Sequence, residues 1–324
     1  MRTPILRLKN ITKAFGEHVV LKDINLDIYQ GEILGIIGIS GSGKTTLLCT
    51  IIGFYKPEYG EILFRVKSLV DNQEIGMKPV HKNQALFKRM YGFAPQYHSF
   101  YEKLTVKENL EYFGTLYGLD KEVIKANIKG LLGFMELEAF QDKLAENLSG
   151  GMQRRLDIAC SMIHEPEILL LDEPTADLDP MLRSHILKLL RDINKKGTTI
   201  IIASHDLVEM ESICDRIAIL HNGKILALGS PEELKKKYSK EKEIILETHP
   251  GKYDKIIKNI KGLISSYKID GTRLVIHSDN PWTLLRKLLG VLDKNEETVI
   301  DLELREPGIK EVFIELTKKN GKDR

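Results

Sequence analysis

The stretch from Gly38 to Thr45 has the residue types and spacing of a loop that binds phosphate groups. It follows the apolar run at 33–37, opens a helical pattern that includes Thr46, and reads Gly38-Ile39-Ser40-Gly41-Ser42-Gly43-Lys44-Thr45. Glycines let the backbone curl so that several N–H groups point at phosphates, while Lys44 can reach the β- and γ-phosphates and the Thr45 hydroxyl can bind Mg²⁺. A glycine-rich turn without a ligand is the competing interpretation, and the flanking strand and helix make it the weaker one. The sequence therefore predicts a magnesium-dependent nucleotide site.

A second helix start with phosphate-binding character lies at Ser149-Gly150-Gly151. It precedes a helical pattern of apolar residues over 152–163. The first N–H groups of a helix lack partners within the helix and lie at the positive end of its dipole, so they attract anions. Because one active site rarely needs two such devices, we expect a second copy of the chain to contribute its Ser149 segment to the first copy's nucleotide. The working unit would then be a dimer.

Two acidic residues, Asp172 and Glu173, follow the apolar run at 168–171. Such a run is typical of a buried parallel strand, which delivers its last residues to the carboxyl edge of a sheet, where ligands bind. We expect Asp172 to hold a hydrated magnesium ion and Glu173 to polarise the water that attacks the γ-phosphate. A helix cap in solvent is the common alternative for an isolated acidic pair.

Two further polar residues also follow predicted strands. His205 comes directly after the apolar strand at 199–203, so it should lie on the same sheet edge as Glu173. A single histidine at such a place is usually structural. Beside a phosphate loop and two acids, we expect it to donate to the γ-phosphate. We likewise expect Gln96, which follows Ala94-Pro95, to contact magnesium or the attacking water.

The elements that must position these residues alternate between strands and helices. Short alternating runs over 5–38 predict strands, and the predicted helices of an insert lie at 105–117, 121–135 and 150–163. Strands and helices then alternate to about residue 239, which predicts an α/β fold with a helical insert. The charged stretch 235–242 is either a linker between domains or the solvated end of a helix.

Beyond this stretch the pattern predicts a small ferredoxin-like α+β domain. The expected order is strand (243–248), helix (252–260), a hairpin turning at Asp270-Gly271, helix, strand (298–304) and helix. Asn280 could cap the second of these helices, with Pro281 at its first position.

The bulk composition limits the classes of function. The 324 residues suffice for about two domains, and 48 basic against 46 acidic residues give a net charge of +2, so we expect no nucleic acid partner. The longest apolar runs are far shorter than the roughly 18 residues that a membrane span needs, and no secretory signal precedes the first strand, so we expect a cytoplasmic protein. Three widely separated cysteines, Cys49, Cys160 and Cys214, predict buried thiols rather than disulfides or a zinc site.

Together these motifs resemble the ATPase subunit of ABC transporters, with matches from about residue 5 to 235. Gln96 looks like the glutamine of the family's Q-loop, 148–153 like its signature sequence, Asp179 like the D-loop aspartate and His205 like the switch histidine. Phe15 occupies the place of the aromatic residue that stacks on adenine.

The resemblance implies a P-loop NTPase fold of the ABC type, with a helical insert and an antiparallel β subdomain. The ATPase domain would span 1–238, with its helical subdomain at about 104–165, and an accessory α+β domain would span 243–324. The family pairs two ATPase domains head to tail around two ATP molecules with Mg²⁺, which agrees with the dimer inferred above. The partner would be an identical chain or a paralogue. Separate transmembrane permease subunits would hold the ATPase at the inner face of the cell membrane, and the aromatic loop 97–103 is our candidate contact with them.

The chain departs from the family pattern in several places. Ile39-Ser40 stands where many relatives have Pro-Asn, Phe15 replaces a commoner tyrosine, and Asp177 adds a charge near the expected dimer seam. The segment 71–83 also looks longer than usual, and the sequence assigns it no role.

The tail of the chain bears on the direction of transport. Residues 302–307 and 312–316 are similar to the end of an accessory region on many prokaryotic export ATPases, although any amphipathic last helix would look much the same. An exporter is therefore our main prediction, with an importer ATPase or a soluble ABC ATPase of translation or DNA repair as alternatives. A kinase or GTPase with a phosphate loop would lack the signature sequence.

Overall fold

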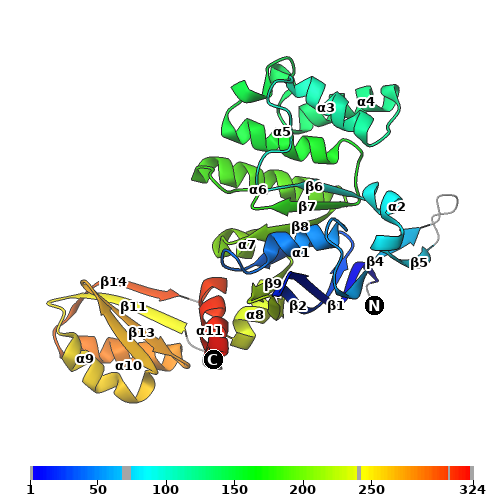
Figure 1. Ribbon diagram of the computed structural model, residues 1–324. Helices are drawn as coiled ribbons and strands as arrows, with labels where there is room; N and C mark the ends of the chain where they lie inside the picture. Colours follow the sequence, from blue (N-terminus) through cyan, green and yellow to red (C-terminus); the bar gives the residue numbers. More distant parts are fainter. Residues whose placement is uncertain (1–2, 68–73, 239–241, 306, 322–324) are drawn as a thin grey trace. The chain divides into compact units, whose positions relative to one another are not determined.

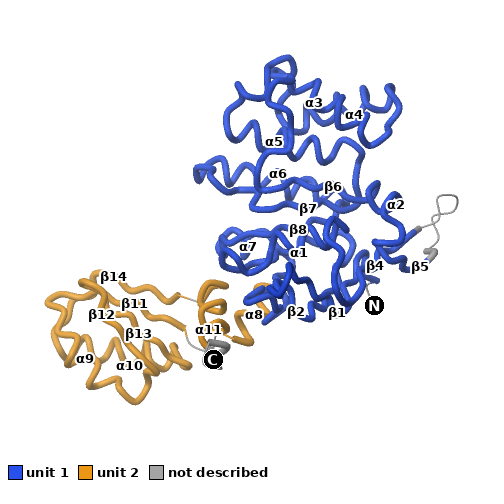
Figure 2. Tube along the Cα trace, viewed as in Figure 1, with its two compact units in different colours: residues 1–230 blue, residues 231–324 orange. Residues whose placement is uncertain are grey.

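A computed structural model of the chain describes residues 3–67, 74–238, 242–305 and 307–321. The chain forms two compact units, Met1–Ser230 and Pro231–Arg324 (Figure 2). Along the described part of the chain, no helix has both the length and the apolar character needed to cross a membrane.

The centre of the first unit is a mainly parallel sheet with the strand order β10-β9-β3-β8-β7-β6 (Figure 1). Its strands are β3 (Ile33–Ile37), β6 (Tyr91–Ala94), β7 (Ile168–Asp172), β8 (Thr199–Ser204), β9 (Arg216–His221) and the antiparallel β10 (Lys224–Gly229). Every residue of β3, β7 and β8 is buried, as expected for parallel strands covered on both faces. The apolar runs in the sequence therefore correspond to the central strands.

A second, antiparallel sheet has the order β2-β1-β4-β5. It comprises β1 (Pro4–Phe15), β2 (His18–Tyr29), β4 (Tyr59–Lys67) and β5 (Glu74–Pro79), and the helical turn η1 (Val80–Lys82) follows it. The segment 71–83, which the sequence left without a role, thus contributes β5 to this sheet, while residues 71–73 lie outside the described residues. Alternation was too weak there to predict a strand from sequence.

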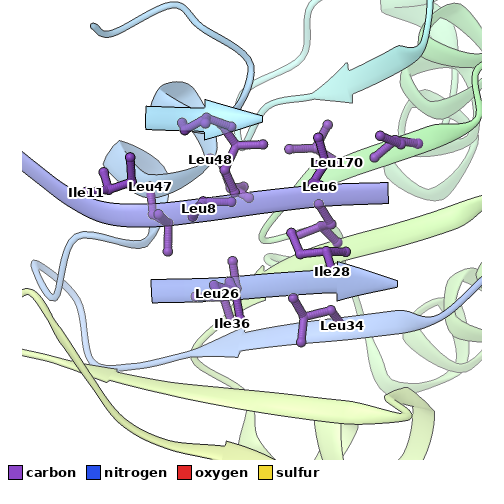
Figure 3. Close-up of a cluster of buried hydrophobic side chains, with 14 of the residues drawn as sticks. Leu6, Leu8, Ile11, Leu26, Ile28, Leu34, Ile36, Leu47, Leu48 and Leu170 are labelled. Carbon is purple, nitrogen blue, oxygen red and sulfur yellow. The ribbon is translucent and has the colours of Figure 1, made fainter. Parts of the chain in front are cut away.

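Helix α1 (Lys44–Ile51) packs between the two sheets. Its side chains Leu47, Leu48 and Ile51 join one buried cluster with Leu6 and Leu8 of β1 and with residues of β3, β7 and β8 (Figure 3). This core fixes the start of α1, and therefore the phosphate loop before it, against the edge of the parallel sheet.

The helices of the insert lie where the sequence predicts them. The insert contains α3 (Val106–Leu116), α4 (Lys121–Phe134) and α5 (Gly150–Met162), with short turns η2 (Glu138–Phe140) and η3 (Ala145–Asn147). Thr105 and Glu108 cap α3 reciprocally. Three more helices complete the unit: α2 (Gln84–Lys88), α6 (Pro180–Lys195) and α7 (Leu207–Ile213). Cys160 and Cys214 are buried as expected, whereas Cys49 is only half-buried.

The second unit has the ferredoxin-like order that the sequence predicts. It contains α8 (Pro231–Tyr238), β11 (Lys242–His249), α9 (Tyr253–Ile260), η4 (Lys261–Leu263), β12 (Ser266–Asp270), β13 (Arg273–Ser278), α10 (Pro281–Lys294), β14 (Thr298–Arg305) and α11 (Ile309–Gly321). The sheet order β12-β13-β11-β14 is fully antiparallel. The Asn280 side chain caps α10 by accepting from the Thr283 N–H at 3.3 Å.

The boundary between the units differs from the one expected at 238–243. Residues 235–238 belong to α8, which packs on α11 and therefore groups with the second unit. The expected linker is thus partly helical, and its residues 239–241 lie outside the described part of the chain.

Glu297 is a buried carboxylate just before β14 that holds the segment leading into α9 by hydrogen bonds. It accepts hydrogen bonds of 2.8 Å from the Thr248 hydroxyl and from the N–H groups of Gly251 and Lys252. Burial alone would raise the pKa of Glu297, but the bonds from Lys252, Thr248 and Gly251 outweigh it and lower the pKa. The ionised form is therefore favoured by folding.

We expect Glu297→Gln to lower the free energy of unfolding of the full chain by about 1–3 kcal/mol, because hydrogen bonds to a charged acceptor are lost. Since folding lowers this pKa below its ordinary value of 4.5, the stabilisation is complete above that pH and is lost as pH falls through the folded value. Urea unfolding at neutral pH and at pH 3 measures both effects, and the exposed Asp293→Asn is the control. Equal stability of the variant and the wild type at neutral pH would contradict this role.

Candidate nucleotide site

Four groups of predicted site residues follow strands that end at one edge of the parallel sheet. The phosphate loop follows β3, His205 follows β8, Asp172 and Glu173 lie at the end of β7, and Gln96 follows β6. These strands are neighbours and run parallel in the order β3-β8-β7-β6. The topology therefore brings the four groups together, as the sequence predicts.

Two glycines of the loop are required by close contacts. A Cβ on Gly38 would lie 2.4 Å from the Leu220 carbonyl oxygen, and one on Gly43 would lie 3.2 Å from the Val20 carbonyl oxygen. Gly43 also has φ of 103°, which a larger residue rarely adopts. The backbone can thus curl tightly before α1, and Val20 of β2 comes against the loop.

Thr45 and Asp172 meet at the start of α1. The Thr45 hydroxyl donates to Asp172 Oδ2 at 2.6 Å. Burial, with a smaller effect of the Glu173 charge, raises the pKa of Asp172. Within the described residues, Asp172 Oδ1 and Ser42 Oγ are buried without a hydrogen-bond partner. A buried carboxylate that has one oxygen without a hydrogen bond and lies next to a threonine hydroxyl suits a hard cation such as Mg²⁺, which prefers oxygen ligands.

Glu173 lies between Lys44 and His205. The Lys44 ammonium is 3.4 Å from Glu173 Oε1 and donates to the Gly38 carbonyl oxygen at 2.9 Å. On the other side, His205 Nδ1 lies 2.9 Å from Glu173 Oε2. The carboxylate is buried while the imidazole is mostly exposed, so His205 faces the solvent side of the edge. This places an acid, a cation and an imidazole within contact distance where a γ-phosphate would meet water.

Phe15 and Gln96 belong to segments that adjoin the phosphate loop and β7. Phe15 ends β1 and pairs with His18 at the start of β2, the strand whose Val20 abuts the phosphate loop. The residue is 46% exposed, and Lys13 Nζ lies 5.0 Å from the ring centre. An exposed ring beside the loop can stack on a base. Gln96 is exposed two residues beyond β6, on the side next to Asp172.

The residues of the second helix start that the sequence predicts to bind phosphate do not join this cluster. Ser149 is the N-cap of α5, and its hydroxyl accepts from the Met152 N–H at 3.4 Å. A Cβ on Gly151 would lie 2.9 Å from the Leu182 side chain of α6, while Gly150 is exposed. Within its own chain this helix start therefore packs on α6.

Asp179 has a structural role within its chain. Its Oδ1 caps α6 by accepting from the N–H groups of Met181 at 2.9 Å and Leu182 at 3.0 Å. The role of Asp179 toward nucleotide stays a prediction.

Sequence reasoning missed Arg154, which connects α5 to the edge of the parallel sheet that carries Glu173. Its guanidinium is buried and donates to the Glu173 carbonyl oxygen at 2.7 Å. The only signal in the sequence is Asp157 one turn later, and an oppositely charged pair at this spacing usually lies on a helix surface.

Related proteins align with nearly the whole chain. Residues 21–176 match the family model described as ABC transporter, and residues 229–317 match the C-terminal domain of ATP-binding proteins of the DrrA1-3 type. The linearmycin resistance ATP-binding protein LnrL of Bacillus subtilis (strain 168) is 30% identical over 98% of this chain and 100% of its own length. The Nod factor export ATP-binding protein I of Rhizobium sp. (strain N33) is 31% identical over 96% of each chain. The chain belongs to the ABC transporter ATP-binding family.

Solved ABC proteins have the same fold as the first unit. The structure of cbiO1 from Clostridium perfringens, part of the ABC transporter complex cbiONQ, is 32% identical with a TM-score of 0.63 over 71% of this chain and 90% of that one. A nucleotide-free ATP-binding cassette from an ABC transporter is 28% identical with a TM-score of 0.60 over 72% of this chain and 94% of that one.

Membership in the ABC family confirms several predictions. The chain is an ATP-hydrolysing subunit that acts with membrane permease components, and it uses ATP, for which Mg²⁺ is the usual ion of the family. Bound Mg²⁺ would neutralise phosphate charge, and Thr45 and Asp172 are the residues placed to hold it. The roles of Lys44 at the phosphates and of Glu173 at the attacking water stay predictions.

Proposed function

We propose that this chain powers an ABC exporter by closing on ATP as a dimer with an identical or paralogous ATPase chain. The dimer is supported by the position of Ser149 and Gly150 at the exposed start of α5. This helix start packs on α6 instead of on the phosphate loop of its own chain. Since this helix start suits an anion, a second chain's ATP is the natural ligand. Each nucleotide would then lie between the phosphate loop of one chain and the Ser149 segment of the other.

Export as the direction of transport rests on the relatives. One named for Nod factor export and one named for linearmycin resistance align over nearly the whole chain, including the second unit. ATP would favour the closed dimer by binding both chains, and loss of the γ-phosphate would let it open. A shift from mostly open to mostly closed needs a preference of about 5.5 kcal/mol, which two shared sites can supply.

The loop 97–103 is our candidate contact with the permease at the inner face of the membrane. Tyr97 is 83% exposed, and the rings of Tyr101 and Tyr112 meet edge to face at 4.8 Å with their hydroxyls 3.1 Å apart. Exposed tyrosines next to Gln96 suit a protein interface, because such residues often dominate binding energy.

Co-purification tests this function. We expect the tagged chain, expressed with the membrane protein encoded by the adjacent reading frame, to retain that protein and to hydrolyse ATP in the complex. Tyr97→Glu should reduce the recovered permease at least about ten-fold, the effect of losing about 1.4 kcal/mol. Tyr267→Glu changes another exposed tyrosine, on β12 of the second unit, and is the control. Active ATPase that never retains a membrane protein would instead favour a soluble ABC ATPase.

A further inference from the structure

Arg154 is a buried cation whose five N–H groups all donate within the protein. The residue is 4% exposed. Its acceptors are the carbonyl oxygens of Pro174 (2.8 Å, from Nε), Pro95 (2.9 Å), Asp172 (3.1 Å) and Glu173 (2.7 Å) and the carboxylate of Asp157 (3.1 Å). An arginine has five N–H donors in a planar fork, so none is left for a ligand. The group therefore acts on the protein backbone.

Three of these acceptors belong to the segment that carries Glu173. Glu173 has φ of 48°, a left-handed conformation that is strained for a residue with a side chain and persists only where the surroundings fix it. Its N–H donates to the Ala203 carbonyl oxygen at 2.8 Å, and its own carbonyl oxygen accepts from Arg154. Because the backbone sets the direction of the side chain, the guanidinium helps to aim the Glu173 carboxylate.

The same guanidinium also holds the backbone that leads to Gln96. Pro95 directly precedes Gln96, and its carbonyl oxygen accepts from the nitrogen that also donates to Asp157. Asp157 is 0% exposed, and its second oxygen accepts from the N–H and the hydroxyl of Ser99 at 2.9 and 2.6 Å. One rigid group thus sets the spacing between the Gln96 loop and the end of β7.

We propose that Arg154 is a positioning residue that holds Gln96 and Glu173 at the separation needed for ATP hydrolysis. This inference rests on the proposed roles of Gln96 at magnesium or water and of Glu173 at water. All five N–H groups of Arg154 donate to residues outside the phosphate loop and Phe15. We therefore expect its loss to affect turnover more than ATP binding. Lysine cannot substitute for it, because three donors on one nitrogen cannot reach carbonyls on both segments.

Arg154→Lys tests this role. We expect kcat for ATP to fall at least ten-fold, since small misplacements of catalytic groups cost about 10²-fold in rate, with the KM for ATP changed less than about two-fold. The magnesium concentration for half-maximal activity should rise, because the Gln96 loop is displaced. Arg155→Lys is the matched control on the next residue of α5, whose guanidinium binds the Met135 carbonyl oxygen at 3.1 Å and pairs with Glu136 in the insert. It should keep the wild-type kcat within about two-fold.

Asp157→Asn is the second variant, because it preserves volume, removes the charge that faces Arg154 and replaces one of the two accepting oxygens by an NH₂ group. It should lower kcat by a smaller factor than Arg154→Lys does. If circular dichroism shows that Arg154→Lys does not fold, Asp157→Asn becomes the test of the positioning role. A folded Arg154→Lys chain with wild-type kcat and magnesium dependence would overturn the proposal, as would a loss of rate explained wholly by a raised KM. Unchanged kcat and magnesium dependence in Asp157→Asn would overturn it equally.

Failure of this proposal can be told apart from failure of the proposed function. If Glu173→Gln abolishes turnover while Arg154→Lys does not, the catalytic assignment stands and only the positioning role is wrong. If Glu173→Gln hydrolyses ATP normally, the assignment of the water-polarising residue is itself wrong.

Discussion

Glu173→Gln is expected to slow ATP turnover at least about 10²-fold while ATP binding is retained. The substitution keeps the shape of a side chain that lies 3.4 Å from Lys44 and 2.9 Å from His205, but an amide cannot take a proton from water. ATP should still enter, because Lys44, Thr45 and the loop glycines are untouched. The uncleaved γ-phosphate should then keep two chains together.

Single-turnover hydrolysis and light scattering with magnesium and ATP measure the two effects. Glu167→Gln is the matched control, because this exposed glutamate lies just before the opposite end of β7. We expect that control to hydrolyse ATP at the wild-type rate and to accumulate no dimer. Near-normal turnover by Glu173→Gln would assign the base to another residue, and a strictly monomeric ATP complex would refute the shared nucleotide.

Mixing Lys44→Ala chains with Ser149→Arg chains is expected to restore activity that neither variant has alone. Lys44→Ala removes the cation that grips the phosphates, and losing one preorganised charge stabiliser costs about 10²–10³-fold. Ser149→Arg places a bulky side chain at the exposed start of α5, where the other chain's nucleotide would bind. In a mixed dimer, the intact loop of one chain faces the intact Ser149 segment of the other.

The mixture should recover up to about a quarter of the wild-type sites, because half of randomly paired dimers are mixed and each has one intact site of two. ATPase assays over a series of mixing ratios, with total protein held constant, provide the measurement. Ser212→Arg, on the exposed part of α7, replaces Ser149→Arg in a control mixture, and these chains should be active by themselves, without added Lys44→Ala chains. Activity that never exceeds the sum of the separate variants would show that each site is built from one chain.

The parts of the site that follow β3, β7 and β8 could be predicted from the sequence because each rests on a local pattern. The glycine spacing before Lys44, the acids after 168–171 and the histidine after 199–203 all stand next to buried apolar runs. Parallel strands then bring their ends to one edge without further information. The ferredoxin-like unit was predictable for the same reason, since the Asp270-Gly271 turn and the Asn280-Pro281 cap are local signals.

The rest depends on contacts between residues far apart in the sequence. In the sequence, Arg154 and Asp157 look like a surface pair on a helix. They are buried because α5 packs on β6, and Arg154 then reaches the backbone after β6 and β7. Glu297 is bonded to residues at 248–252, almost fifty positions earlier, and nothing near it in the sequence indicates that partner. The boundary at Ser230 was missed because α8 is assigned by its packing on α11, whereas the charge run suggested a linker.

Lys44 donates to the Gly38 carbonyl oxygen at 2.9 Å and to the Ile39 carbonyl oxygen at 3.4 Å, and its ammonium lies 3.4 Å from Glu173 Oε1. An ammonium has three N–H donors, so a phosphate oxygen bound by Lys44 would compete with these neighbours for them. The residue that we expect to bind phosphate and the residue that we expect to polarise water are therefore directly coupled by charge. We expect a substitution of either one to change the electrostatic environment of the other.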